Sequence, residues 1–409
     1  MPIPGLQERL FKRICAIAVR NLPGSVFPRV WLGKTKVGKQ RRMKMSVIHI
    51  QFSIGEGGLH FCVIGNKAYI YDCGYYGAYV TKHEIYSTYF KIIKSLLQKK
   101  NIKQLNIYIS HMHDDHCNLL KECLASIKPV MQKIIIWIPK INTPEKIHLL
   151  LTSKLNSAAY SRFFNFISDP KRFLDANDDS LLLREISPPE EKKYEPENEV
   201  NGFYSKIAGI EESTSDWVID PLVIKETISP KLVQYIKDKF KGDLQKLKNE
   251  ENFKNFQKEY KKEMKTLKED YHDSMLCLYA GPTTPIYTNH LLRHHSYFPF
   301  RNRILSGWMH TGDAILKKLH KSDFYDYYKQ YADCIGFMQI PHHGSKNNHD
   351  KNFVTDMFEE WIDYRGRIFY FTHSACGGRA KPKINDITQF IQIWPVSEFC
   401  NSCIVAQIV

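Results

Sequence analysis

Apolar and polar residues alternate with a period of two near the start of the chain, which is the spacing of β-strands. Residues 45–74 contain three such runs, VIHIQF, LHFCVIG and KAYIYD, with a glycine-rich turn after the first. Residues 82–100 instead place apolar side chains three or four positions apart, as on one face of a helix. The pattern then predicts a buried strand at 104–110, a helix at 119–127 and a strand at 133–138. Strands that alternate with helices predict an α/β fold.

The character of the chain changes in its middle part. Residues 140–270 contain a proline- and glutamate-rich stretch, followed by a Lys/Glu-rich stretch at 230–268. Apolar residues there recur every three or four positions, which predicts a long helix. Sheet-like patterns return afterwards, at residues 274–280, 303–308, 332–339 and 367–372. We therefore expect residues 140–270 to be a helical Lys/Glu-rich insertion.

The expected organisation has four parts. A basic N-terminal arm at residues 1–44 precedes the first half of the α/β fold at 45–139. The insertion at 140–270 separates it from the second half at 271–409.

Composition narrows the class of protein. Hydrophobic residues make up 43% and charged residues 25% of 409 positions, as in soluble globular proteins. No apolar run approaches the roughly 20 residues that span a bilayer, and the N-terminus lacks a signal-peptide pattern. The ten cysteines are scattered without a paired framework, which favours a reducing compartment. These features predict a cytoplasmic protein without a membrane partner.

The charge suggests a polyanionic partner. The formal net charge is +15, an excess that often accompanies binding to nucleic acid. A lysine-rich solvated surface explains the same number, so charge alone leaves both readings open.

Candidate chemistry is concentrated in residues 110–118, SHMHDDHCN, directly after the predicted strand at 104–110. A turn at a strand end can direct closely spaced imidazoles and carboxylates to one point, where they bind divalent cations. We expect His111 and His113 to bind one metal ion, and Asp115 and His116 to bind a second beside it. A polar surface loop that merely contains histidines is the disfavoured alternative.

The H-x-H-x-D-H pattern resembles the metallo-β-lactamase superfamily. Four further stretches fall where that family would place them, namely YDCG at 71–74, HTGD at 310–313, PHHGS at 341–345 and FTHSA at 371–375. The HHGS form is similar to the ComEC-like branch, named for a competence protein. The resemblance implies an αββα sandwich, in which Asp72 supports the metal loop and Asp313 bridges two metal ions.

The resemblance covers roughly residues 45–72, 104–138 and 271–392 and shows two departures. Gly58 stands where the opening turn of the ComEC-like branch usually has Asp, and Lys381 replaces the histidine of a late His-Pro. The arm and the insertion have no counterpart in it.

Several assignments stay open at this stage. His272 is a candidate ligand, with a capping or substrate-contacting role as the alternative, whereas His290, His294 and His295 are expected at the surface or facing substrate. Only one of His342 and His343 needs to bind metal. Lys346 suits a phosphate group, although Ser345 and its neighbours equally suit an ordinary helix N-cap. The full set of expected metal ligands is His111, His113, Asp115, His116, His272, Asp313, His342 and His343.

The resemblance and the basic composition together predict a metal-dependent hydrolase, most specifically a phosphodiesterase or nuclease. Two divalent ions, Zn²⁺ or Mn²⁺, would provide a metal-bound hydroxide that attacks phosphorus. The expected catalytic residues are Asp115, His343 and Lys346, with His373 as a second candidate near the developing charge.

Three alternatives remain at the level of sequence. The first alternative is a hydrolase of a small ester, thioester or nucleotide. The second is an interaction protein whose metal site only stabilises the fold. In the latter case residues 140–270, including the predicted helix at 230–268, would contact a protein partner. The ComEC-like resemblance also makes an effector of a prokaryotic defence system, acting beside a partner ATPase, conceivable.

Overall fold

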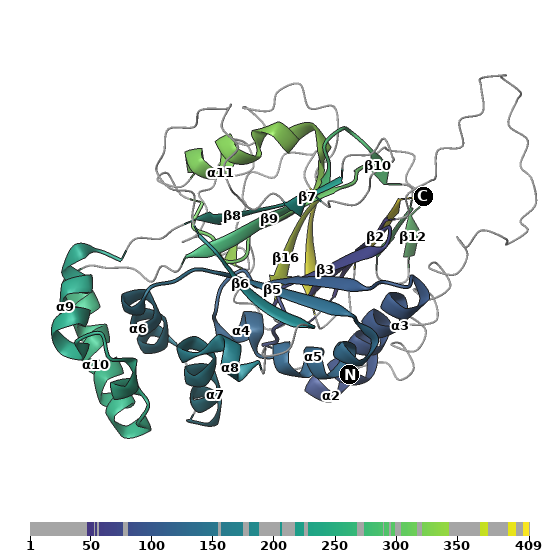
Figure 1. Cartoon of the computed structure of the whole chain (residues 1–409). Helices are drawn as coiled ribbons and strands as arrows, with labels where there is room; N and C mark the ends of the chain where they lie inside the picture. Colours follow the sequence, from purple (N-terminus) through teal and green to yellow (C-terminus); the bar gives the residue numbers. More distant parts are fainter. Residues whose placement is uncertain are drawn as a thin grey trace, which may run out of the picture.

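The computed structural model of the chain contains two β-sheets packed face to face, with helices on both outer faces (Figure 1). The expected αββα sandwich is thus confirmed. The structure describes residues 47–52, 54, 57–76, 81–153, 157–174, 180–187, 205–206, 217–224, 228–267, 274–288, 290–293, 296–298, 304–316, 321–342, 369–374, 392–397 and 404–408.

The first sheet is antiparallel on one side and parallel on the other. Its strands lie in the order β12-β11-β18-β1-β2-β3-β4-β5-β6, with β3 to β6 parallel to one another. Their bounds are β1 (Val47–Gln51), β2 (His60–Ile64), β3 (Lys67–Tyr71), β4 (Gln104–Tyr108), β5 (Lys133–Pro139), β6 (Leu181–Ile186), β11 (His290–Arg293), β12 (Ser296–Phe298) and β18 (Ile404–Ile408).

The second sheet has the order β17-β16-β15-β14-β9-β8-β7, with β14 to β17 parallel. Its strands are β7 (Ser205–Lys206), β8 (Trp217–Ile224), β9 (Met275–Pro282), β14 (Gly307–His310), β15 (Ile335–Gln339), β16 (Phe369–Ser374) and β17 (Gln392–Ser397). A separate two-stranded ladder joins β10 (Tyr287–Thr288) to β13 (Ile304–Leu305).

Most of the helices lie on the outer face of the first sheet, and α11 lies on that of the second (Figure 1). The α-helices are α2 (Lys82–Glu84), α3 (Lys91–Lys99), α4 (Asp114–Cys117), α5 (Leu120–Ile127), α6 (Thr143–Thr152), α7 (Ser157–Ser168), α8 (Pro170–Phe173), α9 (Pro230–Phe240), α10 (Glu250–Leu267) and α11 (Lys321–Tyr328). A π-helical segment, η1 (Ile85–Phe90), joins α2 to α3, and 3-10 helices occur at η2 (Lys128–Val130), η3 (Leu244–Leu247) and η4 (Lys329–Cys334). None of these described helices is both long enough and apolar enough to cross a membrane.

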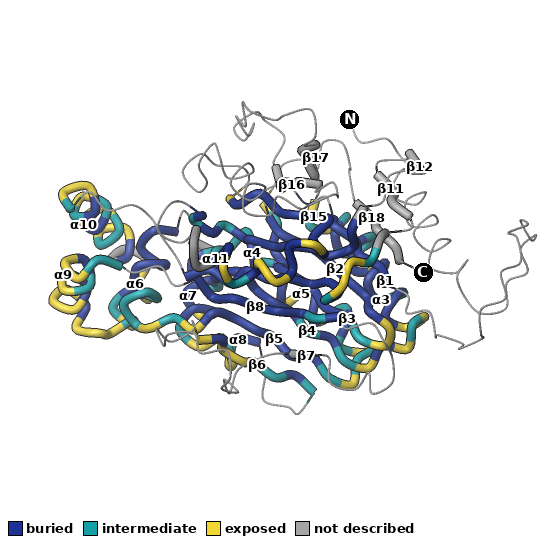
Figure 2. Tube along the Cα trace, turned by 90° about the horizontal axis from the view of Figure 1, so that it is seen from above, coloured by how far each residue is buried: buried dark blue, intermediate teal, exposed yellow. Residues whose placement is uncertain are grey.

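The period of two in each strand sorts its side chains between two cores. In β1, Ile48 and Ile50 join the core between the first sheet and its helices, whereas Val47 joins the core between the two sheets. A third core lies between the second sheet and α11. The central strands are therefore buried on both faces, as the buried trace in Figure 2 shows.

The middle of the chain differs from the expectation in two respects. The helix predicted at 230–268 is broken, because Lys241 and Gly242 adopt left-handed conformations with φ of 53° and 71°, so α9 ends at Phe240. The segment 140–270 also contains strands: β6 extends the first sheet, and β8 pairs with β9 in the second. Besides its helices, the segment therefore contributes strands to both sheets. The four-part division of the chain stays a prediction, and the arm at 1–44 lies outside the described residues.

Candidate metal centre

Four strand ends converge on one site between the two sheets. The parallel strands β3 and β4 end at Asp72 and at the loop 109–113, and the parallel strands β14 and β15 end near Asp313 and His342. Parallel strands present their carboxyl ends at the same edge of a sheet, which explains the convergence. Leu276 N–H in the second sheet donates to Ser110 O at 2.7 Å and ties the two edges together.

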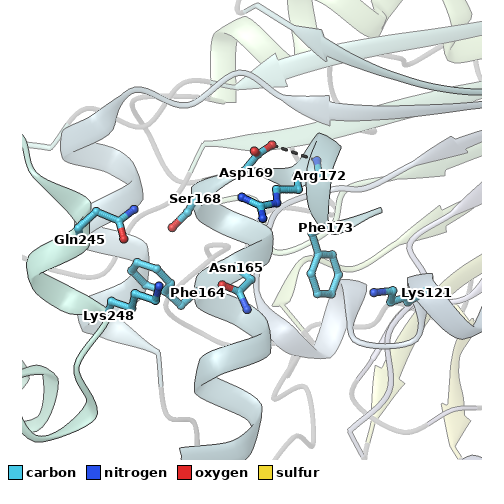
Figure 3. A pocket seen from close by; sticks show the side chains of 9 residues that line it. All are labelled: Lys121, Phe164, Asn165, Ser168, Asp169, Arg172, Phe173, Gln245 and Lys248. Carbon is cyan, nitrogen blue, oxygen red and sulfur yellow. Dashed lines mark hydrogen bonds between the residues drawn. The ribbon is translucent and has the colours of Figure 1, made fainter. Parts of the chain in front are cut away.

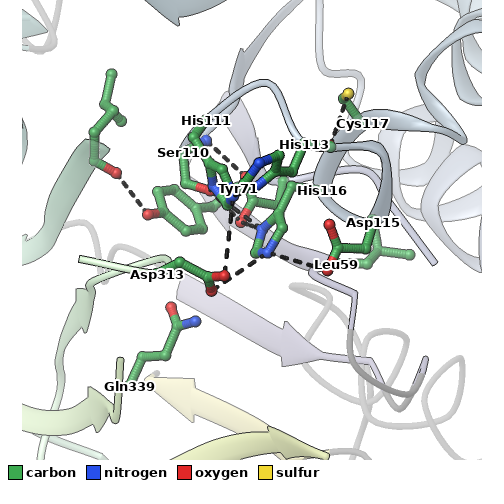
Figure 4. A network of polar contacts seen from close by, with 12 residues as sticks. Leu59, Tyr71, Ser110, His111, His113, Asp115, His116, Cys117, Asp313 and Gln339 are labelled. Carbon is green, nitrogen blue, oxygen red and sulfur yellow. Dashed lines mark hydrogen bonds and ion pairs between the residues drawn. The ribbon is translucent and has the colours of Figure 1, made fainter. Parts of the chain in front are cut away.

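Asp313 lies at the centre of the site (Figure 4). Its Oδ1 is 3.4 Å from His116 Nε2, whereas its Oδ2 is 3.9 Å from His111 Nε2 and 3.8 Å from His342 Nε2. The two oxygens of this carboxylate thus face different histidines, which is the arrangement expected of a bridging ligand.

The donor atoms fit a divalent cation. One nitrogen or oxygen each from His111, His116 and Asp313 lie within 4.8 Å of one another. Two ligands held about 2.1 Å from a tetrahedral ion are about 3.4 Å apart, close to the separations observed at Asp313. Imidazole and carboxylate together suit Zn²⁺ and Mn²⁺ alike, so the donor set alone does not select the metal.

The remaining residues of the H-x-H-x-D-H pattern flank this group on two sides. His113 Nδ1 lies 2.9 Å from His111 Nε2, and Asp115 Oδ2 lies 3.9 Å from His116 Nε2. The expected pairing of His111 with His113, and of Asp115 with His116, is therefore compatible with the positions of the side chains. Asp115 is also the more exposed of the two carboxylates, with 30% of its side chain accessible against 12% for Asp313.

Asp72 supports the loop through both carboxylate oxygens. Its Oδ1 accepts from Ser110 N at 2.6 Å, and its Oδ2 accepts from Ser110 Oγ at 2.9 Å and from His116 Nδ1 at 2.8 Å. The hydrogen-bonding role expected of Asp72 is confirmed. Because a carboxylate only accepts, Nδ1 of His116 carries the proton and Nε2 faces the site.

Ser110 is a supporting residue that sequence reasoning missed. Its Oγ contacts Asp72 and also lies 3.0 Å from His111 Nδ1 and 3.2 Å from His116 Nδ1. It therefore orients both histidines from behind. Its only signal in the sequence is its position, since it directly precedes His111 at the end of a buried strand.

The backbone around the site is unusually constrained. Asp72 and His342 have φ of 58° and 46°, a left-handed conformation that side chains rarely adopt and that often marks functional sites. A Cβ on Gly58 would lie 2.8 Å from Asp72 Oδ2, and one on Gly74 would overlap the carbonyl oxygen of Asp115. Gly58 therefore leaves room for the carboxylate of Asp72.

The pKa values of the two buried histidines are shifted in opposite directions. Burial, together with His116 and His113, moves the pKa of His111 well below its usual value and keeps it neutral. Burial opposes protonation of His116 as well, but the carboxylates of Asp72, Asp313 and Asp115 outweigh it and raise its pKa well above the usual value. The three carboxylates thus give the surroundings of His116 a negative charge, which favours a cation there.

Three of the expected site residues, His272, His343 and Lys346, lie outside the described residues. His294, His295 and Lys381 do so as well, and the side chains of His290 and His373 are not described. Of the expected ligands, the structure brings together His111, His113, Asp115, His116, Asp313 and His342.

Comparison with solved structures finds low similarity over most of the chain. Unliganded yeast PDE1 matches 90% of this chain and 100% of its own, at 10% identity and a TM-score of 0.40. The metallo-β-lactamase fold protein YhfI from Bacillus subtilis matches 86% and 96%, at 9% identity and a TM-score of 0.37. A long form of RNase Z from yeast matches 90% of this chain and 42% of its own, at 10% identity and a TM-score of 0.33.

Sequence comparison adds no relative. No protein-family model matches the chain, and no curated protein matches its sequence.

Proposed function

We propose that this protein is a metal-dependent hydrolase of phosphodiesters, most specifically a nuclease, with two divalent cations in the centre around Asp313. The observation that carries the proposal is the position of the Asp313 carboxylate, whose oxygens face His116 on one side and His111 and His342 on the other. The proposed ligands are His111, His113, Asp115, His116, Asp313 and His342, with His272 and His343 as further candidates.

The cations, when bound, would supply Lewis acidity and a water of lowered pKa. The chain's own residues orient the reaction around them. Asp72 and Ser110 fix the rings of His116 and His111 from behind. Asp115, partly exposed beside His116, would orient the attacking water. His343 and Lys346 are proposed to contact the phosphate.

A nucleic-acid substrate is favoured by the charge of the chain. The net charge of +15 attracts a polyanion, and it would raise the encounter rate with DNA or RNA. A cytoplasmic location, a defence role and a protein partner for residues 140–270 remain predictions, as does the finer resemblance to the ComEC-like branch. Hydrolysis of a small ester or nucleotide is the alternative substrate class.

The test combines metal content with turnover. We expect about two Mn²⁺ or Zn²⁺ per chain by elemental analysis, and cleavage of single-stranded DNA, duplex DNA or RNA by the loaded protein. Asp115→Asn should lower turnover by about a hundredfold or more, in the range of losses seen on removing a group that acts in the transition state.

Asp114→Asn is the matched control, because it makes the same change one residue earlier. The Asp114 carboxylate accepts from Asn118 Nδ2 at 3.2 Å and is not part of the proposed ligand set. Intact polymers together with turnover of bis-p-nitrophenyl phosphate would contradict the nuclease proposal and favour a small substrate. Bound metal without any turnover would instead favour an interaction protein with a structural metal site.

A further inference from the structure

A pocket of about 630 Å³ opens among the helices that cover the first sheet (Figure 3). Its walls come from α5, α7, α8 and η3, and it shares no residue with the metal centre. Its volume lies in the range of small-ligand sites, roughly 300–1,000 Å³.

Cations dominate its lining. Lys121 approaches it from α5, Arg172 from α8 and Lys248 from the residue after η3, and Asp169 contributes the one carboxylate among its described lining residues. Asp169 is engaged as the N-cap of α8, since its Oδ1 accepts from Arg172 N at 3.0 Å. Within the described part of the chain, the side chains of Arg172 and Lys248 form no ion pair, so their charge is available to an anion.

The rest of the lining is aromatic and hydrogen-bonding. Phe164 is buried and Phe173 is half-buried, with Lys121 Nζ 4.8 Å from the centroid of the Phe173 ring. Figure 3 places these rings between the flanking lysines. Asn165 and Gln245 add amides. Ser168 also lines the pocket, and its Oγ is buried without a hydrogen-bond partner among the described residues.

We propose that this pocket binds a phosphorylated nucleoside. Its phosphate would lie against Arg172, whose fork of N–H donors suits phosphate oxygens, and Lys121 and Lys248 would flank the ligand on opposite sides. The base would contact the phenylalanine rings and the amides, since aromatic side chains are the usual stacking platforms for bases. The same chemistry occurs in a free nucleotide and at the end of a nucleic-acid strand. The proposal does not rest on the function proposed for the metal centre.

Binding to the full chain tests the proposal directly. The probes are a fluorescent non-hydrolysable ATP analogue and a 5′-phosphorylated oligothymidylate with phosphorothioate linkages. Arg172→Ala should weaken binding of the probe that occupies the pocket by about tenfold to a hundredfold, as expected for a hydrogen bond to a charged group. Lys171→Ala is the matched control, because it removes the same charge from the same short helix without lining the pocket, and it should change binding less than about twofold.

Asp169→Asn gives a change in the opposite direction. Asn is an equally good N-cap, so α8 is retained while the only carboxylate among the described lining residues is lost. Affinity should rise about two- to fivefold, the range of an exposed charge pair, and a damaged fold would not produce a gain.

The two probes distinguish the source of the ligand. Tighter binding of the ATP analogue would identify a free nucleotide as the ligand, whereas tighter binding of the oligothymidylate would identify the end of a nucleic-acid strand. Equal effects of Arg172→Ala and Lys171→Ala, or binding of polyglutamate as tight as that of both probes, would overturn the proposal.

Discussion

Asp72 connects the backbone of the metal loop to the ring of His116 through two carboxylate oxygens. Replacing it with Asn keeps the shape but removes the charge that fixes the proton on Nδ1 of His116. We expect Asp72→Asn to lower metal affinity by about tenfold to a hundredfold, the usual cost of losing such a partner. Isothermal titration calorimetry with Zn²⁺ or Mn²⁺ measures this metal affinity. Asp238→Asn, at an exposed position on α9, should leave the affinity unchanged.

Gly74 leaves no room for a side chain, because a Cβ there would overlap the carbonyl oxygen of Asp115. Gly74→Ala should therefore destabilise the fold by about 1–3 kcal/mol or more and displace the metal loop. The urea concentration at the unfolding midpoint and the metal content per chain should both fall. Gly65→Ala is the comparison: its φ is 57° but the space around it is open, so it should cost stability without affecting metal content. Equal metal loss in both variants would show that the effect is not local.

His49 lies between the sheets, where burial lowers its pKa to about 3. It packs on His60, Tyr69 and Trp308, and its Nδ1 is 3.2 Å from His60 Nε2. In the unfolded chain a histidine titrates near pH 6.5. Below about that pH the unfolded state therefore binds a proton that His49 does not bind in the folded state, and this favours unfolding. Stability contributed by neutral His49 is thus present above about pH 6.5 and is lost as the pH falls toward about 3.

The slope of that loss approaches about 1.4 kcal/mol per pH unit for one such histidine. Urea unfolding at several pH values between about 7 and 5 measures this slope of the unfolding free energy. His49→Gln keeps a hydrogen-bonding side chain but removes the titration, so its stability should vary less with pH. An unchanged slope in this variant would assign the acid sensitivity to other groups.

At the level of elements, a buried carboxylate joins the second sheet to its helical layer. Asp220 on β8 accepts from Tyr327 OH at 2.7 Å and from Tyr331 OH at 2.8 Å. Tyr331→Phe would leave one oxygen of this carboxylate without its donor, so we expect a loss of about 1.5–3 kcal/mol in unfolding free energy. Tyr76→Phe, on an exposed side chain, should change it by less than about 0.5 kcal/mol. Indistinguishable unfolding midpoints would refute a structural role for the contact.

Elements with a clear periodicity were predictable from the sequence, and those with conflicting residues were not. The strands that became β1 to β5 and the face of α3 follow their apolar spacing. In contrast, β8 contains Pro221, which cannot donate to a sheet and argues against an interior strand, yet β8 lies between β7 and β9. The break between α9 and α10 depends on two left-handed residues, of which only Gly242 is visible as a signal.

On the scale of the whole molecule, the candidate site is only partly encoded in local sequence. The H-x-H-x-D-H pattern and Asp313 are recognisable as separate stretches, but only the family resemblance, and no feature of either stretch, predicts that they face each other. That arrangement comes from the packing of the two sheets. The supporting role of Ser110 and the need for Gly58 depend equally on neighbours distant in the chain, so they were not predictable.

The pocket between α5, α7, α8 and η3 was also invisible in the sequence. Its cations lie at positions 121, 172 and 248, and each alone is an ordinary surface residue. The excess of positive charge predicted a polyanionic partner, but it gave no indication of where on the surface that partner would bind.

Two hydrogen bonds cross from one sheet to the other beside the metal loop, from Leu276 N to Ser110 O and from Tyr71 OH to Leu276 O. They join segments that are more than 150 residues apart in the sequence. During synthesis, the H-x-H-x-D-H loop therefore emerges long before Asp313 is available to complete the site. A metal ion bound at that point would be held only by the ligands of this loop. Tight metal binding therefore requires that the two sheets have docked, and it can serve as a measure of that step.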